Sequence, residues 1–269
     1  MVFLASVGDV SPLTSIVIPC FNYGDYLAEA IDSALAQTHR PIEVIVVNDG
    51  STDHSETVAK AYGDRIRYVH QANAGVPAAR NAGIRLAGGD YVVFLDADDT
   101  LDDTFVAKCA SVLEAHAEAG FVYTQRRSFG RESGCSRFPQ YDLDELKRSN
   151  FIHATALIRA AVLRDHTFDE TFARGHEDWH FFLTLAEHGI QGVLVDQPLF
   201  SYRKHQDRTS KLDSLSYRGC RSRLEVVRAH PRLYTRSEKL DAFVRAAIEP
   251  GRVTAGRVKR RMKRWLSGS

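Results

Sequence analysis

Three carboxylates follow directly on an apolar stretch in the first half of the chain. Residues 91–95 (Tyr-Val-Val-Phe-Leu) predict a buried strand, and Asp96, Asp98 and Asp99 come next. In an extended chain, residues two apart project to the same side, so Asp96 and Asp98 would point together and Asp99 away from them. Crowded carboxylates repel one another, and all-oxygen ligands suit a hard divalent cation such as Mg²⁺ or Mn²⁺. Such a cation commonly neutralises a diphosphate; the alternative interpretation of this stretch is a solvated turn.

A second group of reactive side chains lies in a predicted helix over residues 175–188. His176, Glu177 and His180 spell H-E-x-x-H, which places two histidines on one helix face and is the signature of a zinc metalloprotease. The extended form of that signature requires a glycine and a third histidine, but Leu183 and Ala186 stand at those positions. A metalloprotease is therefore a rival hypothesis with an incomplete ligand set.

Composition excludes several classes of protein. With 269 residues and 44% hydrophobic content, the chain can form one large domain or two small ones with a proper core. A net charge of +1 argues against a nucleic-acid-binding protein. Four widely separated cysteines are typical of a reducing cytosol rather than of a disulfide framework. The N-terminus has no signal-peptide pattern, and no apolar run approaches the ~20 residues of a membrane-spanning helix. We therefore expect a cytoplasmic protein, soluble or peripheral to a membrane.

Strands and helices alternate in the first hundred residues. Short apolar runs predict strands over residues 15–19, 42–47, 65–70 and 91–95, and helical periodicity predicts helices over 24–37, 53–62 and 76–87. Such alternation indicates βαβ units and a parallel sheet, in which ligands bind beyond the carboxyl ends of the strands. Neither G-x-G-x-x-G nor the phosphate-binding G-x-x-x-x-G-K-[ST] occurs, which argues against dinucleotide oxidoreductases and P-loop kinases.

The pattern loosens after residue 101. We predict a helix over 102–118, a strand over 120–124, a long polar connection over 125–150, a strand over 151–158 and a short helix over 159–164. The helix over 175–188 is followed by short strands over 192–195 and 199–202. Everything after residue 210 is expected to be helical, with the last helix over 252–266.

Four motifs resemble those of the family 2 glycosyltransferases, which have the GT-A fold. They are Val-Ile-Pro-Cys-Phe-Asn-Tyr (17–23), Val-Val-Asn-Asp-Gly-Ser-Thr-Asp (46–53), Asn-Ala-Gly-Val-Pro-Ala-Ala-Arg-Asn (73–81) and Phe-Leu-Asp-Ala-Asp-Asp (94–99). The resemblance is closest over residues 15–100, continues at 175–210 and is absent from the basic tail. It implies an α/β, Rossmann-like nucleotide-diphospho-sugar transferase fold with a C-terminal helical extension, and inverting transfer of a sugar from a nucleotide diphosphate donor.

The resemblance also implies a domain plan. Residues 1–14 would be a lead-in, residues 15–205 the GT-A catalytic domain, and residues 206–269 a helical, basic extension. Within the catalytic domain, residues 15–100 would be the nucleotide-binding half and residues 101–205 the acceptor half.

Donor-binding residues follow from the same resemblance. Those assigned to the nucleotide and its diphosphate are Pro19, Phe21, Asn22, Asp49, Asn73, Gly75, Arg80, Asp96, Ala97, Arg208 and Ser210. Within this set, Asp49 would accept a hydrogen bond from the base, typically uracil, and Asp96 would face the ribose. Arg208 would meet the diphosphate through the forked donors of its guanidinium. For Pro19 and Gly75 the alternative explanation is turn chemistry alone.

The resemblance places the chemistry on Asp178. This residue would be the general base that deprotonates the acceptor hydroxyl as its oxygen attacks the anomeric carbon. Glu177 and Trp179 would border the acceptor and raise the pKa of Asp178; alternatively, Trp179 is a core aromatic residue. The metal ligands for Mn²⁺ or Mg²⁺ would be Asp98, Asp99 and His205.

The basic C-terminal segment has two interpretations. Residues 251–269 contain seven Lys or Arg and no acid, and the apolar residues of the predicted helix over 252–266 lie mostly three or four apart. Such a helix can lie on an anionic membrane surface, which would suit a lipid-linked acceptor and peripheral contact at the inner face of the membrane. The alternative is a solvated helix, or one packed on the domain or on a partner.

Together these features predict an inverting, metal-dependent, non-processive glycosyltransferase that moves one sugar, from a UDP donor, to a glycan or lipid-linked acceptor. A nucleotide-sugar-binding module without turnover is an alternative that the presence of Asp178 argues against. A nucleotidyltransferase would need a glycine-rich loop after the first strand, and the sequence has none there. No motif identifies the donor sugar, the acceptor or the oligomeric state.

Overall fold

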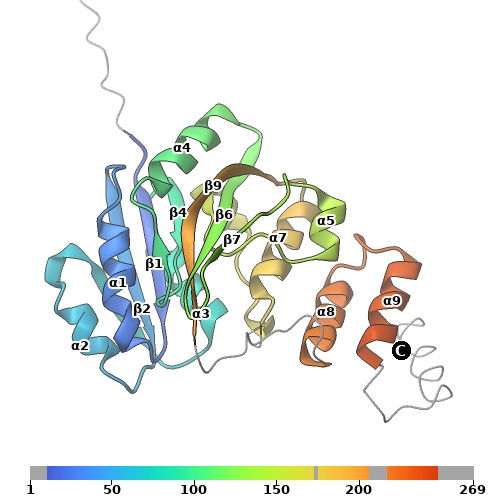
Figure 1. Ribbon diagram of the computed structural model, residues 1–269, viewed down its shortest axis with the longest axis horizontal. Coiled ribbons are helices and arrows are strands. Elements are labelled where there is room, and N and C mark those ends of the chain that lie inside the picture. The colour runs from blue at the N-terminus through green and yellow to red at the C-terminus, as the bar shows by residue number, and fades with distance from the viewer. Residues whose placement is uncertain (1–10, 173–174, 206–216, 248–269) are drawn as a thin grey trace, which may run out of the picture.

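The computed structural model describes residues 11–172, 175–205 and 217–247. One nine-stranded sheet runs through its centre in the order β3-β2-β1-β4-β8-β6-β9-β5, with β7 paired to β6 (Figure 1). The strands are β1 (Thr14–Cys20), β2 (Ile42–Asp49), β3 (Arg67–Gln71), β4 (Tyr91–Phe94), β5 (Thr100–Leu101), β6 (Ala119–Gly130), β7 (Gly134–Ser136), β8 (Leu157–Arg159) and β9 (Gln191–Lys204).

Helices cover the sheet and extend beyond one end of it (Figure 1). The α-helices are α1 (Gly24–Leu35), α2 (Ser55–Lys60), α3 (Val76–Leu86), α4 (Phe105–Ala115), α5 (Leu143–Arg148), α6 (Ala160–Asp165), α7 (Glu177–Glu187), α8 (Tyr217–Ala229) and α9 (Arg236–Ala247). Two 3-10 helices are η1 (Gly63–Arg65) and η2 (Glu170–Phe172).

The first half of the chain forms the parallel part of the sheet, as its alternating pattern predicts. β1 pairs in parallel with β2 on one side and with β4 on the other, and β2 pairs in parallel with β3. Helices α1, α2 and α3 connect these strands in turn, which makes each connection a βαβ unit. The carboxyl ends of β1, β2 and β4 therefore lie at one edge of the sheet, where ligands bind in open α/β sheets.

Alternation along β1 divides the core into two layers. Ile16 and Ile18 face the layer that contains Leu27 and Ile31 of α1. Val17 faces the opposite layer, which contains apolar residues of α3 and α7. The side chains of Ile16, Val17, Ile18, Leu27 and Ile31 are fully buried, and the burial of each stabilises the fold by roughly 1.5–3 kcal/mol. Burial on both faces explains why β1 is a continuous apolar run rather than an alternating one.

Helix α3 packs close to β1 because it carries a glycine at the contact. A Cβ atom at Gly83 would lie 2.1 Å from Cγ1 of Val17, which is well inside the contact distance of two carbon atoms. A side chain is therefore excluded at this position. The close approach holds Arg80, one helical turn earlier, within hydrogen-bonding distance of Asp96 beyond β4.

Two segments of the second half differ from the sequence-based expectation. Residues 125–150, expected to be a long connection, contain the outer part of β6, β7 and α5. The outer part of β6 is partly exposed while it pairs with β7 and β9, so it lacks the apolar run that marks a buried strand. Residues 151–158, expected to be a strand, join the sheet only at β8, and the apolar residues before it are buried without strand pairing.

Strand β9 replaces two strands that were expected separately. The whole segment pairs in parallel with β6, and the register shifts so that Thr124 lies opposite Val195 and Gln125 opposite Pro198. Asp196 and Gln197 are thus left out of the pairing as a bulge, which accommodates the missing N–H of Pro198. Pro198 therefore lies within one continuous strand.

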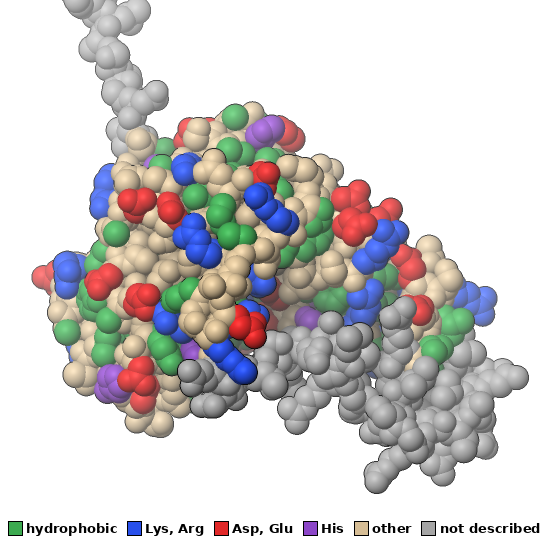
Figure 2. Space-filling view, in the orientation of Figure 1, with side chains coloured by type: hydrophobic (Ala, Val, Ile, Leu, Met, Phe, Trp, Pro, Cys, Tyr) green, Lys and Arg blue, Asp and Glu red, His purple; other side chains and the backbone are tan. Residues whose placement is uncertain are grey.

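Helices α8 and α9 lie beyond α7, at the end of the molecule away from α1 and α2 (Figure 1). They share a small apolar cluster that comprises Leu224, Val227, Tyr234, Ala242 and Phe243. In the described ranges, no helix has the length and apolar character needed to span a membrane. The predicted basic helix over residues 252–266 lies outside the described residues. On the face seen in Figure 2, acidic and basic side chains are interspersed, in keeping with the net charge of +1.

Candidate active site

The loops after β1 and β2 are joined by Asn22. Its backbone has a φ of 57°, a left-handed conformation that asparagine tolerates better than most residues. The side-chain Oδ1 accepts from the main-chain N of Thr52 at 2.8 Å, and the Asn22 N donates to Oγ of Ser51 at 2.9 Å. Pro19 is buried within β1, whereas Phe21 is 43% exposed. An aromatic ring is thus presented to solvent beside the carboxyl ends of the strands.

Asp49 holds the turn that precedes α3. Its carboxylate is 2% exposed and accepts from Nε2 of Gln71 at 2.7 Å, from N of Ala74 at 2.9 Å and from N of Gly75 at 2.8 Å. Asn73 Nδ2 also donates to the main-chain oxygen of Asp49, at 2.9 Å. Because a carboxylate offers about four acceptor positions, one remains for a ligand donor. The predicted role of Asp49 at the base stays a prediction, and the structure adds a role in shaping the loop.

Arg80 connects the two halves of the site. Its side chain is 3% exposed and bonds Asp96 at 2.9 Å through Nη2 and Glu177 at 2.9 Å through Nη1. Burial by itself lowers the pKa of Arg80, but the negative charges of Asp96, Glu177 and Asp178 have the larger effect and raise it. The bridge places the acidic stretch after β4 beside the first turn of α7, two segments that lie far apart in sequence. Arg80 is engaged by carboxylates here, and its predicted contact with the phosphates remains untested.

Asp98 and His205 face one another at the end of β9. Oδ2 of Asp98 lies 2.7 Å from Nε2 of His205, and each side chain is 16% exposed. Residues 97–98 form a turn, in which the main-chain N of Asp99 donates to the main-chain oxygen of Asp96 at 3.0 Å, so the alternation expected of an extended chain does not apply here. Oδ1 of Asp99 accepts from the main-chain N of Arg203 at 2.8 Å. Burial and then the charge of Asp96 raise the pKa of Asp98. Burial, Asp98 and Asp96 together raise the pKa of Asp99 well above its ordinary value.

This acidic group suits a divalent cation in its chemistry. The raised pKa values express crowding of negative charge that a cation would relieve. Asp98 offers an oxygen ligand and His205 a nitrogen ligand, and these two atoms lie 2.7 Å apart. Among the described residues, no three His, Cys, Asp or Glu side chains form a complete metal site. A cation held by Asp98 and His205 would have coordination positions left for a diphosphate and water, as is usual for Mg²⁺.

Asp178 lies in the first turn of α7 and is partly exposed. Its Oδ1 accepts from Nδ2 of Asn150 at 3.0 Å and from the main-chain N of Trp179 at 2.8 Å. Burial is the main cause that raises its pKa to about 7, with a further contribution from Glu177, while Arg80 acts in the opposite direction. A carboxylate with a pKa near neutrality is suited to accept a proton under ordinary conditions.

Trp179 belongs to the core, which was the alternative to stacking on an acceptor. Its side chain is 2% exposed, and Nε1 donates to the main-chain oxygen of Leu146 at 2.6 Å. A ring enclosed in this way presents no face to an incoming sugar. Glu177, with a side chain that is 17% exposed, remains at the surface of the site.

The two histidines of H-E-x-x-H have different partners. His176 caps α7 with a φ of 62°, and its ring lies edge-on to Trp179 at 5.4 Å between centroids. Nδ1 of His180 lies 2.7 Å from Nε2 of His230. Neither belongs to a group of three potential ligands in the described part of the chain. This arrangement does not support the metalloprotease hypothesis.

Sequence reasoning missed several residues of the site. Asn150 lies in a segment without motifs, and only the fold brings its amide to Asp178. Nε of Arg203 donates to the main-chain oxygen of Asp98 at 2.9 Å, although a basic stretch also suits a solvated loop. Arg126 donates to Nε2 of His153 at 3.1 Å and acts to lower the pKa of Asp99. No sequence signal distinguishes Asn150 and Arg126 from ordinary surface side chains, whereas Arg203 lies in the stretch over which the family resemblance continues.

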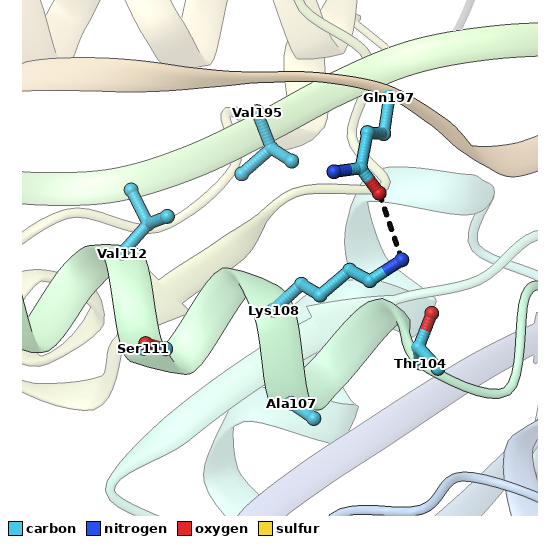
Figure 3. Close-up of a pocket in the computed structure, with 7 residues that line it drawn as sticks. All are labelled: Thr104, Ala107, Lys108, Ser111, Val112, Val195 and Gln197. Carbon is cyan, nitrogen blue, oxygen red and sulfur yellow. Dashed lines mark hydrogen bonds between the residues drawn. The ribbon is translucent and has the colours of Figure 1, made fainter.

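A pocket of about 400 Å³ lies between α4 and β9 and contains none of these groups (Figure 3). Lys108 reaches across it and donates to Oε1 of Gln197 at 2.7 Å. The residues that line the pocket are Thr104, Ala107, Lys108, Ser111, Val112, Val195 and Gln197.

Two predicted diphosphate contacts, Arg208 and Ser210, lie outside the described residues.

Comparison with known proteins identifies the family. Residues 15–173 match the family described as Glycosyl transferase family 2. An uncharacterized glycosyltransferase of Rickettsia typhi is 54% identical over 191 residues, which are 65% of this chain and 60% of that protein. The uncharacterized glycosyltransferase EpsJ of Bacillus subtilis is 48% identical over 227 residues, 75% of this chain and 64% of that protein. The chain thus spans less than two thirds of the length of these relatives.

Solved structures show the same fold at low sequence identity. Staphylococcus aureus TarS, residues 1–349 in complex with UDP-GlcNAc, superposes with a TM-score of 0.68 at 18% identity and covers 87% of this chain and 70% of its own. The mannosyltransferase PcManGT from Pyrobaculum calidifontis, in complex with GDP-Man and Mn²⁺, has a TM-score of 0.62 at 16% identity, with 97% and 82% covered. Both likenesses confirm the predicted GT-A fold.

Proposed function

The chain belongs to the family 2 glycosyltransferases, and we propose that it transfers one sugar from a UDP-sugar to a hydroxyl of a glycan or lipid-linked acceptor, with inversion. The observation that carries the proposal is the Arg80 bridge. It joins Asp96, at the predicted donor side, to Glu177, and so brings Asp178 with its pKa of about 7 to the same place. The predicted donor-binding edge and the predicted base are thus linked through one arginine.

The donor would occupy the edge formed by the loops after β1, β2 and β4. The exposed ring of Phe21 can stack on a base, and the remaining acceptor position of Asp49 can take an imide N–H. TarS is described with UDP-GlcNAc and PcManGT with GDP-Man, so structures with this fold hold different nucleotide sugars. Uracil rather than guanine is our choice for this chain, and the choice is tested below.

Asp98 and His205 would hold a Mn²⁺ or Mg²⁺ ion, with Asp99 close behind them. When bound, such an ion supplies positive charge against the diphosphate. PcManGT is described with Mn²⁺, which supports the choice of ion. Arg203 holds the acidic loop in place through two hydrogen bonds. Its main-chain N donates to Oδ1 of Asp99, and its Nε donates to the main-chain oxygen of Asp98.

In the reaction, the acceptor oxygen forms a bond to the anomeric carbon while the bond from that carbon to the UDP oxygen breaks. The acceptor proton passes to Oδ2 of Asp178, because Oδ1 is already occupied by Asn150 and Trp179. UDP leaves with the electron pair of the broken bond. Attack from the face opposite the leaving group inverts the configuration at that carbon.

The proposal is tested first by ligand binding and then by product formation. Thermal shift against UDP, GDP, dTDP and CMP, each with and without Mn²⁺, should show a rise in melting temperature with UDP that is larger with Mn²⁺. UDP-sugars should then release UDP. A shift with GDP alone would correct the choice of base. Binding of UDP without release from any UDP-sugar, at any acceptor tried, would favour a binding module without turnover.

A further inference from the structure

The helix pair α8–α9 packs against the elements that carry the predicted base. Val226 of α8 belongs to the same core layer as Trp179 of α7 and Leu146 of α5. The pair also has its own cluster, which includes Leu224 and Tyr234. The α8–α9 pair, which forms the C-terminal extension, therefore packs directly on the predicted catalytic domain at this point.

Arg223 of α8 makes two contacts next to the base. Its guanidinium lies 5.4 Å from the ring centroid of Trp179, the residue after Asp178. Its Nη1 donates to the main-chain oxygen of Arg148, the last residue of α5. A cation over an indole is a favourable contact, and a basic group at the carboxyl end of a helix satisfies a carbonyl that has no partner within the helix.

Further contacts hold the same turn of α5. The hydroxyl of Tyr234 donates to the main-chain oxygen of Lys147 at 3.1 Å, and Nζ of Lys147 lies 3.0 Å from Glu238 of α9. Asn150, whose amide donates to Asp178, follows Arg148 by two residues. The extension thus fixes the end of α5 from which Asn150 reaches the base.

The far side of α7 is held by a pair of histidines, of which His230 is buried and His180 partly exposed. His230, 1% exposed, lies 2.7 Å from His180 and 3.1 Å from Glu187 through its two ring nitrogens. His180 stacks on Phe172, with ring centroids 4.2 Å apart and planes 8° apart. The second histidine of the H-E-x-x-H sequence therefore docks α7 onto the extension.

We infer that Arg223 is a positioning residue for Asp178: it holds Trp179 and the end of α5 so that the amide of Asn150 and the main-chain N of Trp179 keep the carboxylate in place. This inference rests on the proposed role of Asp178 as the base. Loss of Arg223 would leave donor binding intact, since the donor residues lie on the loops after β1, β2 and β4. It would loosen the orientation of the base and admit water around it.

Three variants separate this role from a general loss of structure. Arg223→Met keeps the apolar stem and removes the charged head, and Arg223→Lys keeps a cation without the planar fork. As a control, Arg232→Ala removes an exposed arginine from the turn between α8 and α9. We expect kcat to fall about tenfold or more in Arg223→Met, because small misplacements of a catalytic group cost rate steeply. We expect KM for the UDP-sugar to stay within about twofold, partial rescue in Arg223→Lys, and wild-type values in Arg232→Ala.

A second readout does not depend on turnover. Asp178→Asn is made in the wild-type and in the Arg223→Met background, and the stability gain from that substitution is compared between about pH 4.5 and about pH 8. If Arg223 keeps the carboxylate enclosed, the pH-dependent gain shrinks in the Arg223→Met background. An unchanged gain, or wild-type kcat in Arg223→Met, would overturn the inference. If the wild type transfers no sugar, the proposed function fails, and this stability comparison still decides whether Arg223 positions Asp178.

Discussion

Replacing Asp178 with asparagine should stabilise the folded protein more at about pH 8 than at about pH 4.5. Burial, then the charge of Glu177, raises the pKa of Asp178 from 3.8 to about 7. Between these two values the native chain binds a proton that the unfolded chain has released. The free energy of unfolding of the wild type therefore falls as the pH rises through this interval. Asparagine has no charge to bury, so the variant escapes that loss.

The magnitude follows from the two pKa values. A tenfold change in proton affinity corresponds to about 1.4 kcal/mol, so the difference between 3.8 and about 7 sets an upper limit of about 4 kcal/mol. Asp178 is partly exposed, and water near the charged carboxylate reduces the penalty, so we expect about 1–3 kcal/mol. Asparagine keeps an oxygen that can accept from the main-chain N of Trp179, a bond of 2.8 Å in the wild type.

Urea denaturation at both pH values measures this effect. The wild type, Asp178→Asn and Asp103→Asn are compared, the last as a control because Asp103 is exposed. The control should track the wild type at both pH values. If Asp178→Asn differs from the wild type by the same amount at about pH 4.5 and about pH 8, then Asp178 does not carry a raised pKa, and the argument for its enclosure is refuted.

Three further predictions follow from the same geometry. In a pH–rate profile, kcat/KM should rise as the pH passes through about 7, because Asp178 must lose its proton to act as a base; a flat profile from pH 5 to 9 would contradict this. Arg80→Met should lower the free energy of unfolding by about 3 kcal/mol in urea, at the low end for a broken buried ion pair because Asp96 is 44% exposed. Asp98→Asn should abolish the Mn²⁺-dependent part of the UDP thermal shift and keep the metal-independent part, so an undiminished Mn²⁺ effect would count against Asp98 as a ligand.

The parallel half of the fold could be predicted because local signals there agree with one another. β1 and β2 are apolar runs that are buried on both faces, and each is followed by a polar turn and an amphipathic helix. That Asp49 and Asp96 lie at the same edge of the sheet follows from strand direction alone. For the same reason, the candidate acidic site could be named before its geometry was known.

The second half could not be predicted to the same extent because its structure depends on pairing between distant segments. β6 and β9 are parallel neighbours separated by more than sixty residues, and their bulge at Pro198 has no local signature. Asn150 and Arg223 have ordinary residue types in segments without motifs, and only tertiary packing brings them to Asp178 and Trp179. Trp179 itself was left with two interpretations, and burial decides between them.

The most direct test of the central claim measures UDP binding and sugar transfer side by side in the wild type and in Asp178→Asn. Calorimetry with UDP and Mn²⁺ reports the donor site, and mass spectrometry of the acceptor after incubation with UDP-sugars reports transfer. We expect equal UDP affinity in both proteins, with the sugar added only by the wild type. Transfer by Asp178→Asn at the wild-type rate would show that Asp178 is not the base.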